Sequence, residues 1–413
     1  MTPQRIIIVG GGAAGFFAAI NCAEAAPGNE IIILEQGSEF LAKVRVSGGG
    51  RCNATHACYD ARELATHYPR GGQELIGPFQ RFGARDTIAW FKRRGVTFHI
   101  LPDGCLFPST NTSQTVIDCF LNAANAAGVQ LRANSGVAST ARRATGGFEL
   151  TLETGEILPC DRLLLATGGC RSASAGQLAT ALGHTMEPPV PSLFTFELDE
   201  PWLRELSGIV VESVEASAEG LRERGTLLIT HTGLSGPAIL RLSAWGARAL
   251  HERGYKFPLL INWLPLLSAE EVATELQWRR SQQPARLVVN TPIPPLPARL
   301  WEALVLGAGI GRDTRWAVVP RAAMHQLTQQ LTRTSVPVNA KCTNKEEFVT
   351  CGGVRLTEVN FRSMESRICR GLYFAGELLD IDGITGGFNF QAAWTTGWIA
   401  GHAMATPVSV AAW

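Results

Sequence analysis

Near-continuous hydrophobic runs predict buried strands at three places in the chain. Residues 5–9 (RIIIV) and 31–34 (IIIL) lie near the N-terminus, and residues 162–166 (RLLLA) form a third run. Short runs without alternation are typical of parallel strands that are covered on both faces. Between the first two runs, an apolar segment starts at Ala13 and stops near Pro27, which indicates a helix. The order strand, helix, strand predicts an α/β fold with a parallel sheet.

The pattern changes further along the chain and divides it into five segments. A helical pattern covers residues 113–128, where Ser113 is the expected N-cap. Alternating short strands begin after the prolines that end at residue 191, and helical patterns return between residues 268 and 332. The predicted segments are an α/β domain (1–190), a β-rich domain (191–266), a helical insertion (267–333), a return to the β-rich domain (334–352) and a second part of the α/β domain (353–413).

Composition narrows the possible partners. The 413 residues contain 37 basic and 36 acidic side chains, so charge gives no support to nucleic acid as the main partner. No apolar run is long enough to span a bilayer, and no secretory leader precedes the first strand. The ten cysteines have irregular spacing, which fits reduced thiols and no metal site. We therefore expect a soluble, cytoplasmic protein with a small-molecule substrate; its oligomeric state cannot be read from the sequence.

A glycine motif follows the first strand directly. Gly10, Gly12 and Gly15 have the GxGxxG spacing and open the first helix. Gly10 permits a tight turn, Gly12 lets a pyrophosphate approach the backbone, and Gly15 allows the helix to pack against the strand. Glu35 ends the second strand, where a carboxylate accepts hydrogen bonds from ribose hydroxyls. The motif predicts a site for FAD or NAD rather than NADP.

A second glycine-rich segment, residues 43–53 (KVRVSGGGRCN), combines basic side chains with small ones. Such a loop suits phosphates or the edge of a flavin ring. Its candidate cofactor-binding residues are Lys43, Ser47, Gly50, Arg51 and Asn53. The same segment holds Cys52, which together with Cys58 suggests a flavin-linked disulfide. The spacing of the pair is one residue longer than in disulfide reductases, and no second dinucleotide motif accompanies it.

The middle and the end of the chain supply further cofactor candidates. The third strand ends in Thr167 and Gly168, and a short strand near the C-terminus ends at Gly376. Glu377 follows directly and is placed to bind a ribityl hydroxyl or to lie beside the pyrophosphate. Asp380 and Asp382 compete for that role.

A glycine loop then leads through Gly387 and Asn389 into the last helix. The N-terminus of this helix can stabilise negative charge on a reduced flavin, and Asn389 can also act as a helix cap. His231 lies in a separate glycine-containing turn and could donate a proton at the flavin face. A lone histidine is more often structural, so both roles stay open.

Five motifs resemble the bacterial YhiN/BaiN-like FAD-dependent oxidoreductases over nearly the whole chain. They are GGGAAG (10–15), SGGGRCNATH (47–56), THTGLSGPAIL (230–240), CGGVRLTEVN (351–360) and GLYFAGELLDIDGITGGFNFQAAWTTGWIAG (371–401). The resemblance implies a glutathione-reductase-like, Rossmann-type FAD domain with an inserted antiparallel β-barrel and a small helical insert. It also implies FAD contacts at Ala14, Glu35, Lys43, Ser47, Arg51, Asn53, Val137, Glu377, Asp380 and Asn389, with Val137 passing the adenine.

The sequence therefore predicts a flavin-dependent oxidoreductase. Our leading hypothesis is that NAD(P)H reduces FAD, which then reduces an electron-poor, enone-like double bond. The alternative is a flavoprotein whose FAD is structural or regulatory, within a binding or RNA-modifying assembly. A minor alternative is a flavin-linked disulfide reductase. His231 and Cys52 are the candidate catalytic residues.

Overall fold

The protein divides into two compact units that are described separately. The computed structural model describes residues 3–169, 173–342 and 349–406. One unit comprises Met1–Pro191 and Lys345–Trp413, and the other comprises Ser192–Asn344. The chain thus returns to the first unit at residue 345, eight residues before the sequence-based boundary. Residues 349–352, which the pattern assigned to the β-rich domain, lie in a strand of the first unit, β18 (Val349–Val354).

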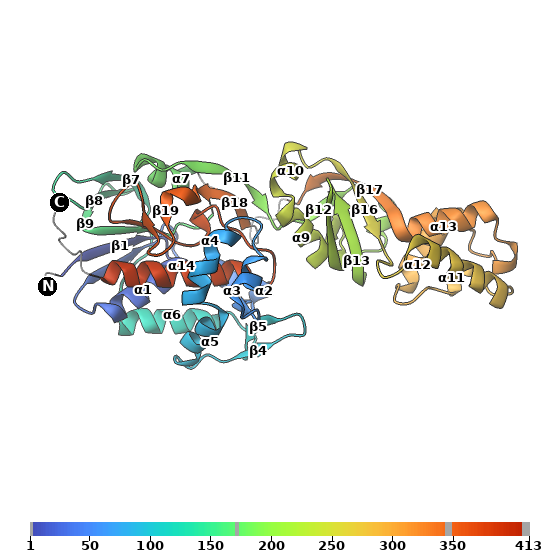
Figure 1. The fold of residues 1–413 in the computed structure, drawn as a ribbon, viewed down its shortest axis with the longest axis horizontal. Helices are drawn as coiled ribbons and strands as arrows, with labels where there is room; N and C mark the ends of the chain where they lie inside the picture. Colours follow the sequence, from blue (N-terminus) through green and yellow to red (C-terminus); the bar gives the residue numbers. More distant parts are fainter. Residues whose placement is uncertain (1–2, 170–172, 343–348, 407–413) are drawn as a thin grey trace. The chain divides into compact units, whose positions relative to one another are not determined.

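A seven-stranded sheet forms the centre of the first unit (Figure 1). Its order is β19-β20-β21-β10-β1-β2-β6, and the five strands from β21 to β6 are parallel. The parallel strands are β1 (Arg5–Val9), β2 (Glu30–Leu34), β6 (Gln130–Arg132), β10 (Arg162–Leu165) and β21 (Leu372–Phe374); β19 (Val359–Asn360) and β20 (Glu365–Ser366) form the antiparallel edge. The three predicted strands are therefore present, and their buried residues explain the apolar runs.

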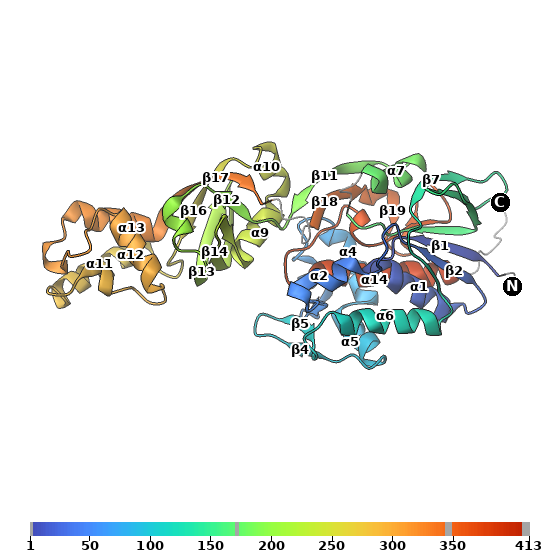
Figure 2. The same ribbon diagram turned by 180° about the vertical axis from the view of Figure 1, so that it is seen from behind.

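Helices α1 (Ala13–Ala25) and α14 (Phe388–Ala405) lie side by side beneath this sheet (Figures 1 and 2). Glycines make the close approach possible. A Cβ at Gly397 would lie 2.7 Å from the Ala14 carbonyl oxygen, and one at Gly401 would lie 2.5 Å from the Ala18 oxygen. The two ends of the chain therefore build one core, in which the ring centroids of Phe17 and Trp394 lie 5.4 Å apart.

Smaller elements surround the sheet. A second sheet, β7 (Val137–Arg142), β8 (Phe148–Leu152) and β9 (Ile157–Cys160), covers the face opposite α1 and α14 (Figure 1). The remaining elements are α2 (Ala42–Gly50), α3 (Ala61–Ala65), α4 (Gly72–Arg81), α5 (Ala84–Lys92), α6 (Gln114–Ala126), α7 (Ala173–Ala181), the sheet β3 (Thr55–His56), β5 (Cys105–Pro108) and β4 (Phe98–Ile100), and β11 (Met186–Ser192), which pairs with β18.

The second unit contains a closed six-stranded antiparallel barrel, which confirms the predicted inserted domain. Its strands are β12 (Phe196–Leu198), β15 (Gly233–Ser235), β14 (Leu221–Ile229), β13 (Val210–Ala218), β16 (Phe257–Asn262) and β17 (Thr334–Lys341), in that order around the barrel. Alternate residues point inward, as Leu259 and Ile261 do on β16. Three short helices accompany the barrel: α8 (Pro201–Arg204), α9 (Pro237–Trp245) and α10 (Ala247–Glu252).

Between β16 and β17 the chain forms the predicted helical insertion. It consists of α11 (Ala269–Gln282), α12 (Ala298–Gly307) and α13 (Arg321–Arg333), with two single-turn helices at Val288–Asn290 and Trp316–Val318. A capping box begins α11, because Ser268 and Glu271 exchange hydrogen bonds at 2.7 and 3.2 Å. Trp301 and Trp316 are fully buried and form its core. Within the described residues, no helix is both long and hydrophobic enough to cross a lipid bilayer.

Candidate functional site

The glycine motif lies at the carboxyl end of β1, and its three glycines have different surroundings. A Cβ at Gly10 would lie 2.3 Å from the Ala166 oxygen, and one at Gly15 would lie 2.0 Å from the Gly10 oxygen. A Cβ at Gly12 would meet no atom within 4 Å. Gly10 and Gly15 are therefore required by the fold itself, whereas Gly12 leaves open space at the N-terminus of α1. This is the arrangement that a bound pyrophosphate needs.

Glu35 lies beside this space and organises the backbone around it. Its carboxylate accepts hydrogen bonds from the N–H groups of Gly11 at 2.7 Å and Gly37 at 2.8 Å. Each carboxylate oxygen has a second lone pair, so Glu35 can still accept from a ribose hydroxyl. The buried Val137 begins β7 close by, because Gly136 pairs with Glu153 and Ser135 donates to the Glu35 carbonyl.

Thr167 supplies an unsatisfied polar atom at the same edge. It follows β10, and its Cα would lie 3.0 Å from a Cβ on Gly10. The Thr167 hydroxyl oxygen is buried and has no hydrogen-bond partner within the described residues. Buried polar atoms without partners are uncommon and point to a missing ligand or water. The next residue, Gly168, has φ +78° and lies near the Lys43 ammonium.

Lys43 and Glu377 connect the second glycine segment to the C-terminal part of the unit. The Lys43 Nζ lies 2.6 Å from Glu377 Oε2, and the Thr350 N–H donates to Glu377 Oε1 at 2.8 Å. A Cβ at Gly169 would collide with Glu377 Oε1 at 2.5 Å. Lys43, Thr167, Gly168 and Glu377, predicted from distant parts of the sequence, therefore gather at one edge of the sheet.

The second glycine segment forms a sharp turn after the first half of α2. Gly48, Gly49 and Gly50 have φ of +57°, +67° and +81°, a succession that side chains with a Cβ strongly disfavour. A Cβ on Gly49 or Gly50 would meet no atom within 4 Å, so this backbone is open to a ligand. Ser47 donates to the Val44 carbonyl at 2.8 Å, and the exposed Arg51 lies 4.4 Å over the ring of Phe107.

Asn53 joins this turn to the loop before α14. In the orientation that satisfies both neighbours, its amide donates to the Thr55 carbonyl at 3.1 Å and accepts from the Gly387 N–H at 3.3 Å. Gly387 has φ +90° and caps α14, and a Cβ there would lie 2.6 Å from the Thr55 oxygen. The N-terminus of α14 is therefore fixed against the glycine turn.

Three candidates remain, Asp382, Asp380 and Asn389, and each makes different contacts. Asp382 is fully buried and forms an ion pair with Arg70, so it no longer competes with Glu377 for a cofactor role. The Asp380 N–H donates to the Val354 carbonyl at 3.2 Å. Asn389 holds the loop closed, because its amide accepts from the Gly383 N–H at 2.9 Å and donates to the Gly383 carbonyl at 2.8 Å.

Gly376 packs against the start of α1, since a Cβ there would lie 2.8 Å from that of the buried Ala14. This contact brings β21, which ends just before Gly376, to the glycine motif of β1. The Gly376 N–H also donates to the Thr396 hydroxyl on α14 at 3.0 Å. Ala14 and Gly376 thus join the three elements that border the candidate cofactor site.

The environment of Cys52 gives no support to thiol chemistry. Cys52 is fully buried, and this burial raises the pKa of its thiol to about 12. Burial also raises the pKa of the Cys58 thiol to about 11. A redox-active cysteine normally has a lowered pKa and is accessible to solvent. Both cysteines are free thiols in the structure, and a role of Cys52 in catalysis remains a prediction.

His231, the predicted proton donor, and His56 have different surroundings. His231 is exposed on the turn after β14, which Thr230 stabilises through hydrogen bonds to Gly233. His56, which the sequence analysis did not single out, lies in the first unit and stacks on Phe388 at 4.7 Å. Its Nε2 donates to the Asp103 carbonyl at 2.9 Å, and its Nδ1 is buried without a partner in the described residues. The contacts of His56 could not be predicted from the sequence, because Asp103 and Phe388 lie 47 and 332 positions away.

The open space at Gly12, the unpaired Thr167 hydroxyl and the exposed glycine backbone fit a bound dinucleotide such as FAD. Together with the parallel sheet and the inserted barrel, they define an FAD-dependent oxidoreductase of the Rossmann type. The family model for the HI0933-like protein Rossmann domain matches residues 4–403. The chain belongs to this family of FAD-dependent oxidoreductases.

Full-length relatives carry two different activity names. The chain is 32% identical to the ribosomal RNA dihydrouridine synthase of Escherichia coli, over 95% of this chain and 96% of that protein. It is 29% identical to the 3-dehydro-bile acid delta(4,6)-reductase of Clostridium scindens, over 97% and 99% of the two chains. The first name weakens our expectation, based on charge alone, that nucleic acid is an unlikely partner.

Solved structures show the same fold at low sequence identity. The 3-ketosteroid delta1-dehydrogenase of Sterolibacterium denitrificans aligns with a TM-score of 0.53 and 11% identity, covering 98% of this chain and 100% of that chain. The 3-ketosteroid-delta4-(5alpha)-dehydrogenase of Rhodococcus jostii aligns with a TM-score of 0.51 and 14% identity, covering 98% and 97%. These similarities concern the fold and not the substrate.

Proposed function

We propose that this flavoprotein reduces a carbon–carbon double bond conjugated to a carbonyl group. The observation that carries the proposal is the pair of full-length relatives. Saturation of uridine in RNA and of a 3-oxo bile acid are the same reaction in chemical terms, because both double bonds are conjugated to a carbonyl. The product gains a hydride and a proton.

Residues at the sheet edge would hold FAD for this reaction. Gly12 and the N-terminus of α1 would bind the pyrophosphate, Glu35 the adenosine ribose, and Thr167 a polar group of the cofactor. The Lys43–Glu377 ion pair and the turn at Gly50 would border the flavin portion. Bound FAD would supply two-electron transfer from a reduced nicotinamide to the substrate.

NADH or NADPH is the proposed electron donor. The donor loses a hydride and becomes NAD⁺ or NADP⁺, so one donor molecule and one proton balance the saturation of one double bond. The sequence contains one strand–GxGxxG–helix motif at its N-terminus and no second one. We therefore propose that the nicotinamide nucleotide binds transiently and leaves before the substrate enters.

Uracil within RNA is our first candidate substrate, and a small enone is the second. The identity to the dihydrouridine synthase favours uracil. The bile acid reductase favours an enone. In both substrates the carbonyl oxygen accumulates negative charge when hydride arrives, and hydrogen-bond donors or a helix N-terminus such as that of α14 would stabilise this charge.

His231 is our candidate proton donor. The imidazole of His231 is exposed, and histidine is the side chain that most readily exchanges protons near neutral pH. A His231→Gln variant should lower the rate of product formation more than the rate of flavin reduction by the nicotinamide. The exposed His325 of α13 offers a matched control, since His325→Gln should change neither rate.

Anaerobic stopped-flow measurements test the proposal directly. The FAD-loaded protein is mixed with NADH or NADPH, and the reduced protein is then mixed with oligouridine, deproteinised ribosomal RNA or 2-cyclohexenone. We expect reduction by at least one nicotinamide, reoxidation by one substrate class, and mass-spectrometric detection of two added hydrogen atoms. A flavin that no nicotinamide reduces, or that neither substrate class reoxidises, would favour the alternative of a structural or regulatory FAD.

A further inference from the structure

The helical insertion has an unusual charge composition. Between Ser268 and Arg333 there are five acidic residues, no lysine and eight arginines: Arg279, Arg280, Arg286, Arg299, Arg312, Arg315, Arg321 and Arg333. Only Arg279 and Arg312 form ion pairs, with Glu275 and Glu302, among the residues that the structure describes. The insertion therefore presents several uncompensated guanidinium groups, although the whole chain is almost neutral.

Two of these arginines are held next to the end of α11. After α11 the chain turns, and residues 284–288 run antiparallel to residues 314–317. Leu287 pairs with Arg315, and the Trp316 N–H donates to the Arg286 carbonyl at 3.0 Å. Arg286 and Arg315 are both exposed on these adjoining segments. Their backbones are thus fixed, and neither guanidinium forms an ion pair within the described residues; Arg286 Nη1 donates to Gln283 Oε1 at 3.5 Å.

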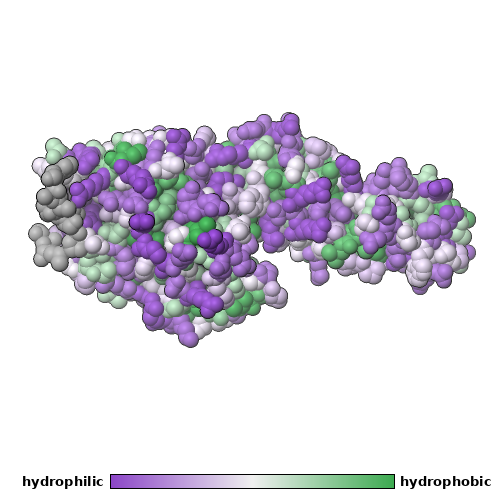
Figure 3. All heavy atoms as spheres, in the orientation of Figure 1, coloured by the Kyte–Doolittle hydropathy of each residue, from purple (hydrophilic) through white to green (hydrophobic). Residues whose placement is uncertain are grey.

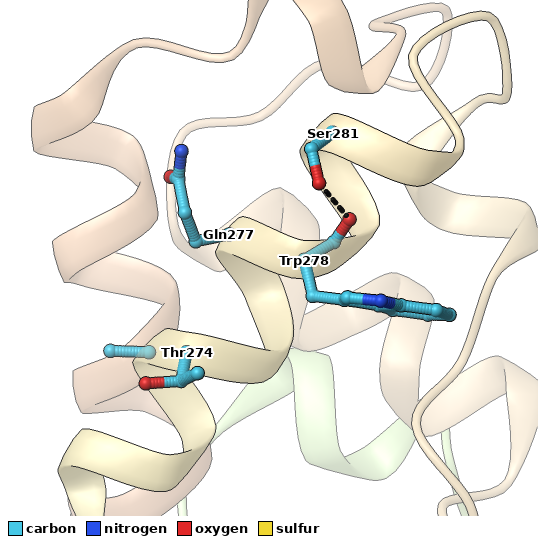
Figure 4. Close-up of a pocket in the computed structure, with 5 residues that line it drawn as sticks. Thr274, Gln277, Trp278 and Ser281 are labelled. Carbon is cyan, nitrogen blue, oxygen red and sulfur yellow. Dashed lines mark hydrogen bonds between the residues drawn. The ribbon is translucent and has the colours of Figure 1, made fainter.

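A tryptophan is exposed on the same end of α11. Trp278 keeps 51% of its surface accessible and lines a shallow hollow with Thr274, Gln277 and Ser281 (Figure 4). Ser281 donates to the Trp278 carbonyl at 2.8 Å. Polar residues predominate on the visible face of the insertion, with hydrophobic ones between them (Figure 3). An indole that the fold leaves uncovered, among polar uncharged side chains, is available to stack on a planar group.

We propose that the α11 surface, which we define as the exposed Gln277, Trp278 and Ser281 of α11 together with Arg286 and Arg315 on the segments beyond its C-terminal end, binds single-stranded RNA. The inference rests on the proposed function and names how its RNA substrate would be held. An unpaired base would stack on Trp278, the arginines would contact phosphates, and Gln277 and Ser281 would form hydrogen bonds. This combination of aromatic and basic groups is the one that single-stranded nucleic acids require. Arginine without lysine also favours phosphate and base-plane contacts.

Fluorescence anisotropy with labelled oligouridine tests the surface on the FAD-loaded protein. Stacking on an aromatic side chain is worth about 1–3 kcal/mol per base, so Trp278→Ala should weaken binding by about fivefold to about a hundredfold. For single strands, each lost phosphate contact lowers the slope of log affinity against log salt by about 0.7. The double variant Arg286→Ala/Arg315→Ala should therefore reduce this slope by about 1.4.

Matched variants control for general effects of each substitution. Trp245→Ala removes another exposed tryptophan of the same unit, and Arg93→Ala removes an exposed arginine at the end of α5. Both should bind oligouridine like the unsubstituted protein. Circular dichroism and FAD content should be unchanged in all four variants, which excludes unfolding as the cause.

The outcomes separate this inference from the proposed function. If the α11 variants bind oligouridine as tightly as the unsubstituted protein, or if that protein does not bind it at all, the inference is wrong, whatever the reductase assay shows. If heparin binds equally well and Trp278→Ala has no effect, the surface is a general anion site and the inference is also wrong. If binding depends on Trp278 but no uridine is reduced, the RNA surface stands and the proposed reaction does not.

Discussion

Lys43 and Glu377 are separated by 334 positions in the chain, yet their side chains meet at 2.6 Å. Lys43 comes from α2, and Glu377 from the turn that follows β21. The Glu377 carboxylate is only 18% exposed and also accepts the Thr350 N–H. This contact fastens the N-terminal and C-terminal parts of the first unit together beside the glycine motif.

Removal of Glu377 should weaken FAD binding more than removal of Lys43. A hydrogen bond to a charged group contributes about 1.5–3 kcal/mol, so Glu377→Ala should lower FAD affinity by about tenfold to a hundredfold. The Lys43 side chain is 54% exposed, and an ion pair with such an exposed partner contributes about 0–1 kcal/mol. Lys43→Ala should therefore change the affinity about fivefold at most. Titration of apoprotein with FAD, followed by flavin fluorescence, measures both; equal losses would contradict the assignment.

Substitutions at Gly12 and Gly15 should have different effects, one on FAD binding and the other on the stability of the fold. A side chain at Gly12 meets only open space, so Gly12→Val should fold normally and lose FAD. A Cβ at Gly15 would lie 2.0 Å from the Gly10 oxygen, and such overpacking typically costs about 1–3 kcal/mol or more. Gly15→Ala should therefore destabilise even the apoprotein. Thermal unfolding and FAD content separate the two effects, and full flavin occupancy in Gly12→Val would show that the pyrophosphate lies elsewhere.

Glu35 should contribute to the stability of the apoprotein as well as to cofactor binding. Its two bonds to Gly11 and Gly37 are present without any ligand. Glu35→Ala should lower the free energy of unfolding by about 1.5–3 kcal/mol, and FAD binding should weaken in addition. Glu35→Gln retains one carbonyl acceptor, so its free energy of unfolding should lie between those of the unsubstituted protein and Glu35→Ala. A variant with unchanged apoprotein stability and weakened FAD binding would show that the ribose contact alone matters.

Local patterns predicted the strands and helices whose residues are buried by near neighbours. The runs that became β1, β2 and β10 are fully covered, so their apolar character is uninterrupted. Strand β7 (VASTAR) was missed because four of its six side chains are exposed. The apolar residues from Ala238 to Leu250 fall in two helices, α9 and α10, which meet at Gly246. A local apolar pattern cannot show such a break.

Contacts that form only in the folded chain account for what the sequence did not reveal about the site. Ser113 occupies the predicted N-cap position of α6, but its hydroxyl makes no capping bond and donates instead to the Arg45 carbonyl of α2. The Asn389 amide was expected to face FAD, and in the structure both its ends bind Gly383. The partner of Ser113 lies in a distant element and leaves no trace in spacing, whereas Asn389 binds a residue six positions before it in the same loop.

Cys52 should be dispensable for electron transfer. With a thiol pKa of about 12 for Cys52 and about 11 for Cys58, neither forms appreciable thiolate near neutral pH. Cys52→Ser and the double variant with Cys58→Ser should keep flavin reduction by the nicotinamide and most of the turnover. Differential alkylation with peptide mapping should show both thiols protected in the native protein. A charge-transfer band that disappears in Cys52→Ser, together with lost turnover, would instead support the disulfide mechanism.

His184 predicts how the stability of the first unit depends on pH. Its side chain is fully buried, with Nδ1 3.0 Å from Glu358 and Nε2 2.8 Å from the Ser366 hydroxyl. Burial lowers the pKa of His184 by more than the nearby Glu358 carboxylate raises it. Burial also disfavours the ionised form of Glu358, but hydrogen bonds from Thr185 and His184 outweigh it and keep the pKa of Glu358 below its usual range. The carboxylate therefore remains charged while His184 titrates.

The first unit should lose stability as the pH falls, because the unfolded chain takes up a proton at His184 more readily than the folded unit does. Above about pH 6.5 His184 is neutral in both states and contributes no pH dependence. As the pH falls below that value, the unfolded chain binds a proton that the folded unit excludes, so the free energy of unfolding decreases until the lowered folded pKa is reached. Native-state hydrogen exchange of the β10 and β21 amides, at about pH 5 and about pH 8, reports on this unit alone. His184→Gln should be less stable at the higher pH and should lose this part of the pH dependence, whereas His325→Gln should retain it. An identical decrease in His184→Gln would assign the effect to another group.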